Sequence, residues 1–297
     1  MSGPVGAPGR ADRRRLVVNG DDFGLAPEVN RAIVRAHCHG ILTSTSLMVT
    51  GPAMAEAVSI ARDLPSLAVG LHLVLVQGRS ACPPREIAGL VSVDRSFRER
   101  AIPAGVLYFF LPGLRAALER EVRAQLEVYR STGLPVSHVD GHLNIHLHPV
   151  VQRVLADLAP EFGIRAVRLT REAVWPDLRW SRKHALRKAF EGTAFGILSA
   201  IAARRFRARG IVSTDRLYGM HESGGCDEPY LRHVLRTLPP GDSEIYCHPA
   251  DAQNEDMRRR MPGYRPADEL AALTSPAIRE IVEARGIELV SWRDLAR

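Results

Sequence analysis

The chain has 297 residues, of which 45% are hydrophobic and 25% are charged, and its formal net charge is +7. This composition is that of a soluble globular protein, and no apolar run approaches the roughly 20 residues of a transmembrane helix, which argues against a membrane-spanning protein. The four cysteines show no CxxC spacing, so we expect reduced thiols in a cytoplasmic protein and not a disulfide-bonded one.

Residues 1–14 form a Gly-, Pro- and Arg-rich leader without the apolar core of a signal peptide, and we expect it to be flexible. After the leader, strand and helix patterns alternate. The expected strands are 16–19, 43–49, 67–75, 136–140, 164–169, 211–214, 244–248 and 287–291. The expected helices are 27–40, 54–63, 114–131, 149–162 and 276–285, and a proline-bearing stretch at 78–112 interrupts the rhythm.

Alternating strands and helices predict an α/β fold with a parallel sheet. Seven or eight strands fit a closed or nearly closed (β/α) barrel, TIM-like and irregular, better than a six-stranded open sheet. The first strand is not followed by a GxGxxG motif, which argues against a dinucleotide-binding fold. We therefore predict one barrel domain over residues 15–297.

A basic segment around residues 175–210 interrupts this domain. It contains nine Lys and Arg and two acidic residues, so the net charge of this segment alone is +7, the same as that of the whole chain. Five apolar residues within it fall on one helical face: Leu186, Phe190, Ala194, Ile197 and Ile201. Such a helix can lie on an anionic membrane surface, or it can pack this face on the barrel core. Nucleic-acid binding is not favoured, because the basic residues are confined to one segment with little aromatic interleaving.

Several expected strands end in residues that can ligate a metal or transfer a proton. The first strand runs into Asp21 and Asp22. Since the carboxyl ends of barrel strands converge on one face, these residues are expected in a common site. Asp22 would be a metal ligand and Asp21 a general base. The alternative is a turn whose aspartate caps the helix at Pro27.

Histidines supply the other candidates. His72 lies in an apolar strand, where it is either a buried core residue or a ligand. His142 and His146 have HxxxH spacing in a run of four histidines, and this run favours a metal or proton-transfer site. His248, at the end of another strand, could protonate a leaving amine.

Carboxylates near these histidines could support them. Asp140 or Asp251 could orient a histidine through a hydrogen bond. An Asp/His/His set suits one divalent ion, such as Mg²⁺ or Zn²⁺. The chain lacks a GxSxG motif, so a serine nucleophile is not expected. The pattern therefore predicts metal-assisted hydrolysis without an acyl-enzyme.

Four motifs, in this order, resemble those of the YdjC-like (ChbG-like) carbohydrate deacetylases: Asn19-Gly20-Asp21-Asp22-Phe23-Gly24, Gly70-Leu71-His72, Val139-Asp140-Gly141-His142 with His146 and His148, and Cys247-His248-Pro249. The resemblance implies an α/β barrel that removes the N-acetyl group of an amino sugar with one divalent metal. It implies Asp22, His72 and His142 as ligands, with His146 as the alternative third ligand. It also implies Asp21 as the base and His248 as the acid.

A narrower resemblance, to the hopanoid-associated HpnK branch, rests on residues 70–76, Gly78-Arg79, Pro83-Pro84 and residues 105–110. It implies an N-acetylglucosaminyl hopanoid as the substrate. Asp140-Gly141 departs from the Asn-Ala expected in many members. Soluble chito-oligosaccharides are the alternative substrate, and a non-catalytic membrane-surface binding protein is the alternative from another class. Peripheral contact with the inner membrane surface through 175–210 and a homodimer are further expectations.

Overall fold

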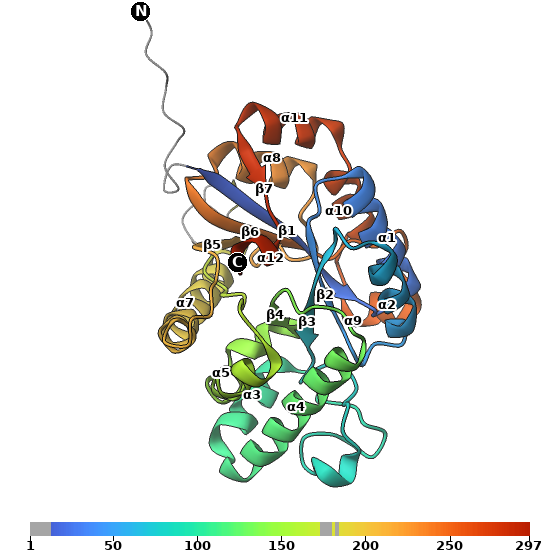
Figure 1. Cartoon of the computed structure of the whole chain (residues 1–297), viewed down its shortest axis with the longest axis vertical. Helices are drawn as coiled ribbons and strands as arrows, with labels where there is room; N and C mark the ends of the chain where they lie inside the picture. The colour runs from blue at the N-terminus through green and yellow to red at the C-terminus, as the bar shows by residue number, and fades with distance from the viewer. Residues whose placement is uncertain (1–12, 173–179, 182–183) are drawn as a thin grey trace, which may run out of the picture.

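The computed structural model describes residues 13–172, 180–181 and 184–297. The leader prediction for residues 1–12 and part of the basic segment, residues 173–179 and 182–183, lie outside this range. Seven parallel strands form the sheet at the centre of the molecule (Figure 1). They are β1 (Arg14–Phe23), β2 (Ser44–Leu47), β3 (Ala68–Leu73), β4 (Val139–Gly141), β5 (Arg216–Tyr218), β6 (Gly241–Cys247) and β7 (Ile287–Leu289).

The strand order is β4-β3-β2-β1-β6-β5, and β7 pairs with the first residues of β1. This sheet confirms the predicted α/β class and the parallel strands. It curls into a half-barrel, so the prediction of a closed or nearly closed barrel with seven or eight strands is not confirmed within the described residues. The expected strands 164–169 and 211–214 are reduced to single bridges, Val139 with Val167 and Ala166 with Val212. One bridge at each contact cannot extend into a ladder, so these segments only line the gap between β4 and β5.

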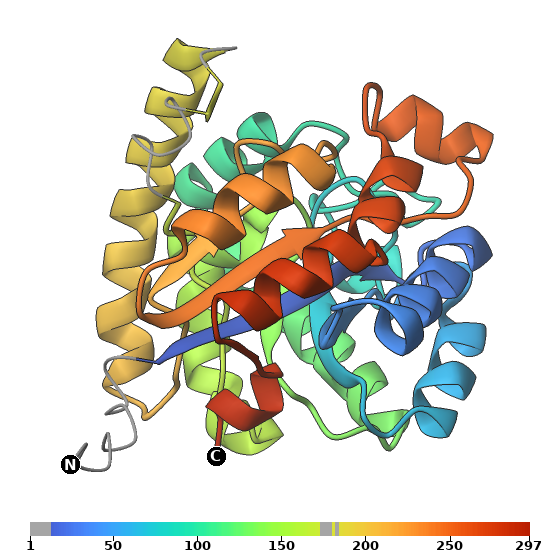
Figure 2. The ribbon, with the colours of Figure 1, turned by 90° about the horizontal axis from the view of Figure 1, so that it is seen from above.

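Helices cover the outside of the sheet (Figures 1 and 2). The longer ones are α1 (Pro27–His39), α2 (Met54–Asp63), α3 (Ala101–Phe110), α4 (Arg115–Ser131), α5 (Pro149–Phe162), α7 (Ala185–Arg207), α8 (Glu228–Thr237), α10 (Pro266–Leu273) and α11 (Pro276–Ala284). Short ones are α9 (Glu255–Arg260), α12 (Trp292–Leu295) and the 3₁₀ turns η2 (Pro84–Glu86), η3 (Pro112–Leu114) and η4 (His142–Leu147). The expected helices are therefore present, and α3 is an additional helix inside the stretch predicted to interrupt the order.

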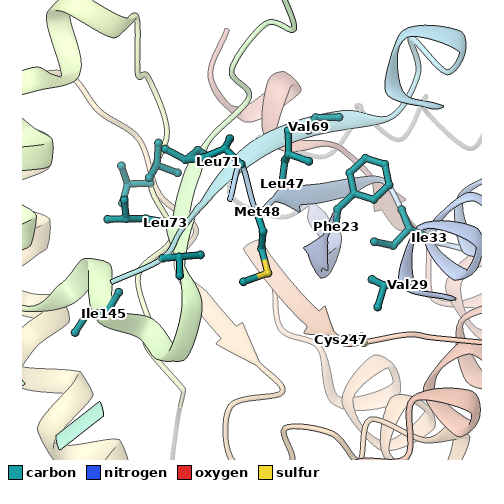
Figure 3. Packing of buried hydrophobic residues seen from close by; sticks show 14 of the residues in the cluster. Phe23, Val29, Ile33, Leu47, Met48, Val69, Leu71, Leu73, Ile145 and Cys247 are labelled. Atoms are coloured by element: carbon teal, nitrogen blue, oxygen red, sulfur yellow. The ribbon is translucent and has the colours of Figure 1, made fainter. Parts of the chain in front are cut away.

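The core lies between the sheet and these helices. From Val17 onward every residue of β1 is buried, because β2, β6 and β7 flank this strand and helices cover it. Figure 3 shows Phe23, at the end of β1, beside Ile33 and Val29 of α1. This packing fixes the carboxyl end of β1, where the two aspartates lie.

The structure of the basic segment contradicts one of the two interpretations of its apolar face. Helix α7 covers most of it, and the side chains of Leu186, Phe190, Ile197 and Ile201 are exposed. The interpretation in which this face packs on the core is therefore wrong. The residues that α7 does bury are Lys188, Ser199, Ala202 and Phe206, which lie on the opposite side of the helix.

Candidate metal centre

Three strand ends bring the central residues together. Asp21 and Asp22 end β1, His72 lies near the end of β3, and His142 follows β4 as the first residue of η4. Asp22 has a φ of 65°, in the left-handed region that aspartate tolerates better than most residues. The backbone twists there, so the neighbouring side chains of Asp21 and Asp22 enter different surroundings. Sequence reasoning predicted the convergence of these residues but not this backbone twist.

Two histidines converge on one oxygen of Asp22. His72 Nε2 lies 3.2 Å and His142 Nδ1 lies 3.1 Å from Asp22 Oδ1. The potential ligand atoms of the three residues all lie within 4.8 Å of one another. The other oxygen of Asp22, Oδ2, is buried and has no hydrogen-bond partner within the described part of the chain. One carboxylate and two imidazoles in this arrangement can hold a divalent cation.

A carboxylate fixes the orientation of His72. The Nδ1–H of His72 donates to Asp140 Oδ1 over 2.8 Å, and Ser46 Oγ lies 3.2 Å from the same nitrogen. This bond points Nε2 at Asp22, so a cation bound there would take the place of the Nε2 proton. Metal-binding histidines commonly have such a carboxylate behind them, because it sets the tautomer and raises the basicity of the ring.

Asp21 is held by an arginine that sequence reasoning missed. Arg168 Nη1 and Nη2 donate to the two oxygens of Asp21 over 2.7 and 2.8 Å. The same guanidinium lies 2.8 Å from Asp140 Oδ2 and donates to Glu244 Oε1 over 2.8 and 3.0 Å. One buried cation therefore links three buried carboxylates. The available signal was a charged residue inside an otherwise apolar segment, at Arg168 and again at Glu244.

The charges of this cluster fit a bound cation. Asp21, Asp22, Asp140 and Glu244 are all buried, and Arg168 is the fixed positive charge among them. Burial opposes ionisation of Asp22, yet His142 and His72 beside it hold the pKa of its carboxyl well below the usual range. Burial likewise opposes a charge on His72, but Asp140 and Asp22 raise the pKa of its imidazole to about 10. The surroundings therefore favour positive charge at the point where Asp22, His72 and His142 meet, and a divalent ion supplies it.

His146 lies outside this set. Its Nε2 donates to the backbone carbonyl of Arg168 over 3.1 Å, and burial lowers the pKa of its ring to about 4. Of the two candidates for the third ligand, the geometry groups His142 with Asp22 and His72. His146 instead supports the segment that carries Arg168.

His248 borders the same cleft as Asp21 and Asp22, together with Tyr264. Its backbone N–H donates to Glu269, and the Tyr264 ring lies against its imidazole with centroids 5.2 Å apart. Asp251, predicted as a residue that orients a histidine, forms a bidentate ion pair with Arg31 at the surface, over 2.7 and 3.0 Å.

The cleft is lined by polar and apolar side chains that could contact a substrate. Leu143 and Asn144 of η4 both adopt left-handed backbone conformations and line one wall. Gln77 and Arg260 also line the cleft, and Arg260 Nη1 donates to the carbonyl of Gln77. Two successive left-handed residues next to His142 are a costly conformation of the kind found at functional sites.

Comparisons with known proteins support the fold and show the family. A "carbohydrate deacetylase" from Geobacillus stearothermophilus is 29% identical over 95% of this chain and 98% of its own length. A "carbohydrate deacetylase" from Mus musculus is 32% identical over 95% of both chains. A proposed cellobiose-phosphate cleavage protein from Enterococcus faecalis, whose structure is known, has 25% identity and a TM-score of 0.75 over 96% of this chain and all of its own. The model of the family described as "YdjC-like protein" matches residues 15–284, and the chain therefore belongs to the YdjC-like family.

Proposed function

We propose that this protein is a metal-dependent deacetylase that hydrolyses the N-acetyl group of an amino sugar. The observation that carries the proposal is the buried Asp22–His72–His142 cluster beside an aspartate that is ion-paired with Arg168, in a cleft that also contains His248. The names of the two carbohydrate deacetylases that align over nearly the whole chain support the reaction class.

Asp22, His72 and His142 would hold the metal. Imidazole donors favour Zn²⁺, whereas the carboxylate also suits Mg²⁺. When bound, a divalent ion supplies Lewis acidity for the amide carbonyl and lowers the pKa of water at the site.

Asp21 would act as the general base. Its bidentate pair with Arg168 and a 2.8 Å hydrogen bond from Asn19 Nδ2 fix the carboxylate in one orientation. A fixed carboxylate can accept the proton of the attacking water without reorganising. The water oxygen then bonds to the acetyl carbon, and the bond from that carbon to the sugar nitrogen breaks. His248 would protonate the departing nitrogen, so that acetate and a free amine leave.

For the substrate we propose an N-acetylglucosaminyl hopanoid, with soluble chito-oligosaccharides as the second candidate. The similarity of residues 70–76 and 105–110 to the hopanoid-associated branch supports the lipid. The first stretch covers the end of β3 and the three residues after it, the second lies on α3, and α3 exposes Ile102, Val106, Phe109 and Phe110. His148 Nε2 donates to the Gly105 carbonyl over 3.0 Å, which joins α3 to the end of η4 beside the cleft.

The test is acetate release from the hopanoid glycolipid and from diacetylchitobiose. The enzyme is stripped with a chelator and then supplied with Zn²⁺, Mg²⁺, Mn²⁺ or Co²⁺, and Asp21→Asn serves as the inactive control. We expect metal-restored release from the glycolipid. Release from diacetylchitobiose alone would keep the chemistry and replace the substrate. Release by the chelated enzyme without added metal would refute the metal-dependent mechanism, and no release from either compound would refute the substrate class.

A further inference from the structure

The large apolar side chains that the structure leaves in solvent are concentrated on two helices. Of the thirteen large hydrophobic residues that are exposed among the described residues, nine lie on α7, on α3 or directly after α3. Those of α7 are Leu186, Phe190, Ile197 and Ile201, and those of the α3 region are Ile102, Val106, Phe109, Phe110 and Leu111. Exposed apolar side chains gathered on a few elements indicate an interaction site.

Both helices carry apolar side chains on two faces, one on the core and one in solvent. Helix α7 packs Ala202, Phe206 and the partly buried Phe195 on the core, while Leu186 (89% exposed) and Phe190 (70% exposed) face solvent on its other side. Helix α3 buries Ala104 and Tyr108 and turns its larger apolar residues outwards. A surface helix normally directs its apolar stripe at the core. The outward stripe therefore indicates that something else covers it.

The two helices lie next to the same elements, and we call their exposed apolar side chains together the α3–α7 surface. Helices α3 and α7 both pack against α5 and against η4, and Figure 1 shows both ribbons near α5. Arg205 of α7 donates to Gln152 Oε1 of α5, and Arg209, two residues after the end of α7, donates to Asp157 of α5 over 2.5 Å. The turn η4 carries His142 and lines the catalytic cleft. The surface formed by α3 and α7 thus adjoins the entrance to the site.

The charges around this surface indicate what covers it. Arg187 near the start of α7 and Arg204 and Arg207 near its end are exposed, so positive charge flanks the apolar stripe. A second copy of the chain packed antiparallel on α7 would place arginines of one copy against arginines of the other. An anionic lipid surface instead attracts these arginines and takes up the apolar side chains between them.

No single helix within the described ranges is long and apolar enough to cross a membrane, although α3 and α4 together, bent by 100°, reach the length and composition of a span.

We infer that the α3–α7 surface lies on an anionic lipid bilayer and holds the cleft at the membrane interface. This inference is independent of the reaction proposed above. It commits to a lipid surface, and a second copy of the chain is the competing occupant.

The experiment measures sedimentation of the full chain with vesicles of phosphatidylcholine alone and of phosphatidylcholine mixed with phosphatidylglycerol. We expect binding to the anionic vesicles that weakens with salt. The double variant Leu186→Glu/Phe190→Glu should lose at least about tenfold in affinity for each apolar side chain withdrawn from lipid. Val93→Glu is the matched control, because Val93 is 97% exposed and lies outside both helices. It should bind like the wild type.

Two results would overturn the inference. One is the absence of binding of the wild type to either vesicle. The other is a wild-type dimer, observed by sedimentation velocity, that the Leu186→Glu/Phe190→Glu variant dissociates, since a second copy would then cover the surface. Circular dichroism and thermal unfolding verify that each variant is folded. Arg204→Glu/Arg207→Glu provides the second, charge-directed variant and should abolish the preference for anionic vesicles.

Discussion

Replacement of Arg168 by methionine tests the buried charge cluster. The substitution removes a guanidinium that contacts Asp21, Asp140 and Glu244, and whose side chain is only 1% exposed. Removing one partner of a buried ion pair costs about 3–5 kcal/mol, because the remaining charges stay buried without compensation. Here three carboxylates lose the same partner, so we expect a loss at the upper end of this range.

The assay is thermal unfolding of the metal-free protein. A change of 1 kcal/mol shifts the melting temperature by about 2–4 °C in proteins of 150–250 residues, so a loss of about 5 kcal/mol in Arg168→Met should lower it by about 10–20 °C. The matched control is Arg209→Met, which breaks the surface ion pair with Asp157. Pairs of that kind contribute at most about 1 kcal/mol. If Arg168→Met unfolds no earlier than Arg209→Met, the cluster does not depend on its arginine and the reasoning is wrong.

Three further predictions concern the site. Asp21→Asn should lower turnover by at least about 100-fold through loss of the base while calorimetry shows unchanged metal binding, and near-normal turnover would exclude Asp21 as the base. Metal at about 100 times its Kd should stabilise the chelated protein against unfolding by about 2.7 kcal/mol. His142→Ala should abolish this stabilisation and His146→Ala should retain it. The opposite result would make His146 the third ligand. A Cβ at Gly70 would lie 2.3 Å from His138 Nδ1, so Gly70→Ala should cost about 1–3 kcal/mol in denaturant unfolding, and an unchanged midpoint would contradict the close packing.

The central residues of the site were predictable because strand periodicity is local. Apolar runs that end in Asp21, Asp22, His72 and His142 identify strand ends, and parallel strands bring such ends to one edge. Arg168 was not predictable in the same way. Its partners Asp21, Asp140 and Glu244 come from three other segments, and only the folded sheet places them around one side chain.

Two other differences between the predictions and the structure concern α3 and α7. The stretch 78–112 was predicted to interrupt the order of helices and strands because it contains prolines. One of them, Pro103, is nevertheless the third residue of α3, in the first turn, where proline is tolerated. The apolar periodicity of α7 predicted its stripe but not the direction of the stripe. Helix α7 has a second apolar face, with Phe195, Ala202 and Phe206, and this face meets the core.

The position of β1 also affects when the site can form during protein synthesis. β1 carries both aspartates and is made early, but it pairs along its length with β6, as the bond between Arg15 and Asp242, 227 residues apart, shows. At about 5–20 residues per second the ribosome needs about 10 to 45 s to reach that partner. During this interval the nascent chain has an apolar strand with one unpaired edge. Chaperones that bind such strands should therefore associate with the nascent chain until β6 emerges, and the aspartates should reach their final positions only after β6 has paired with β1.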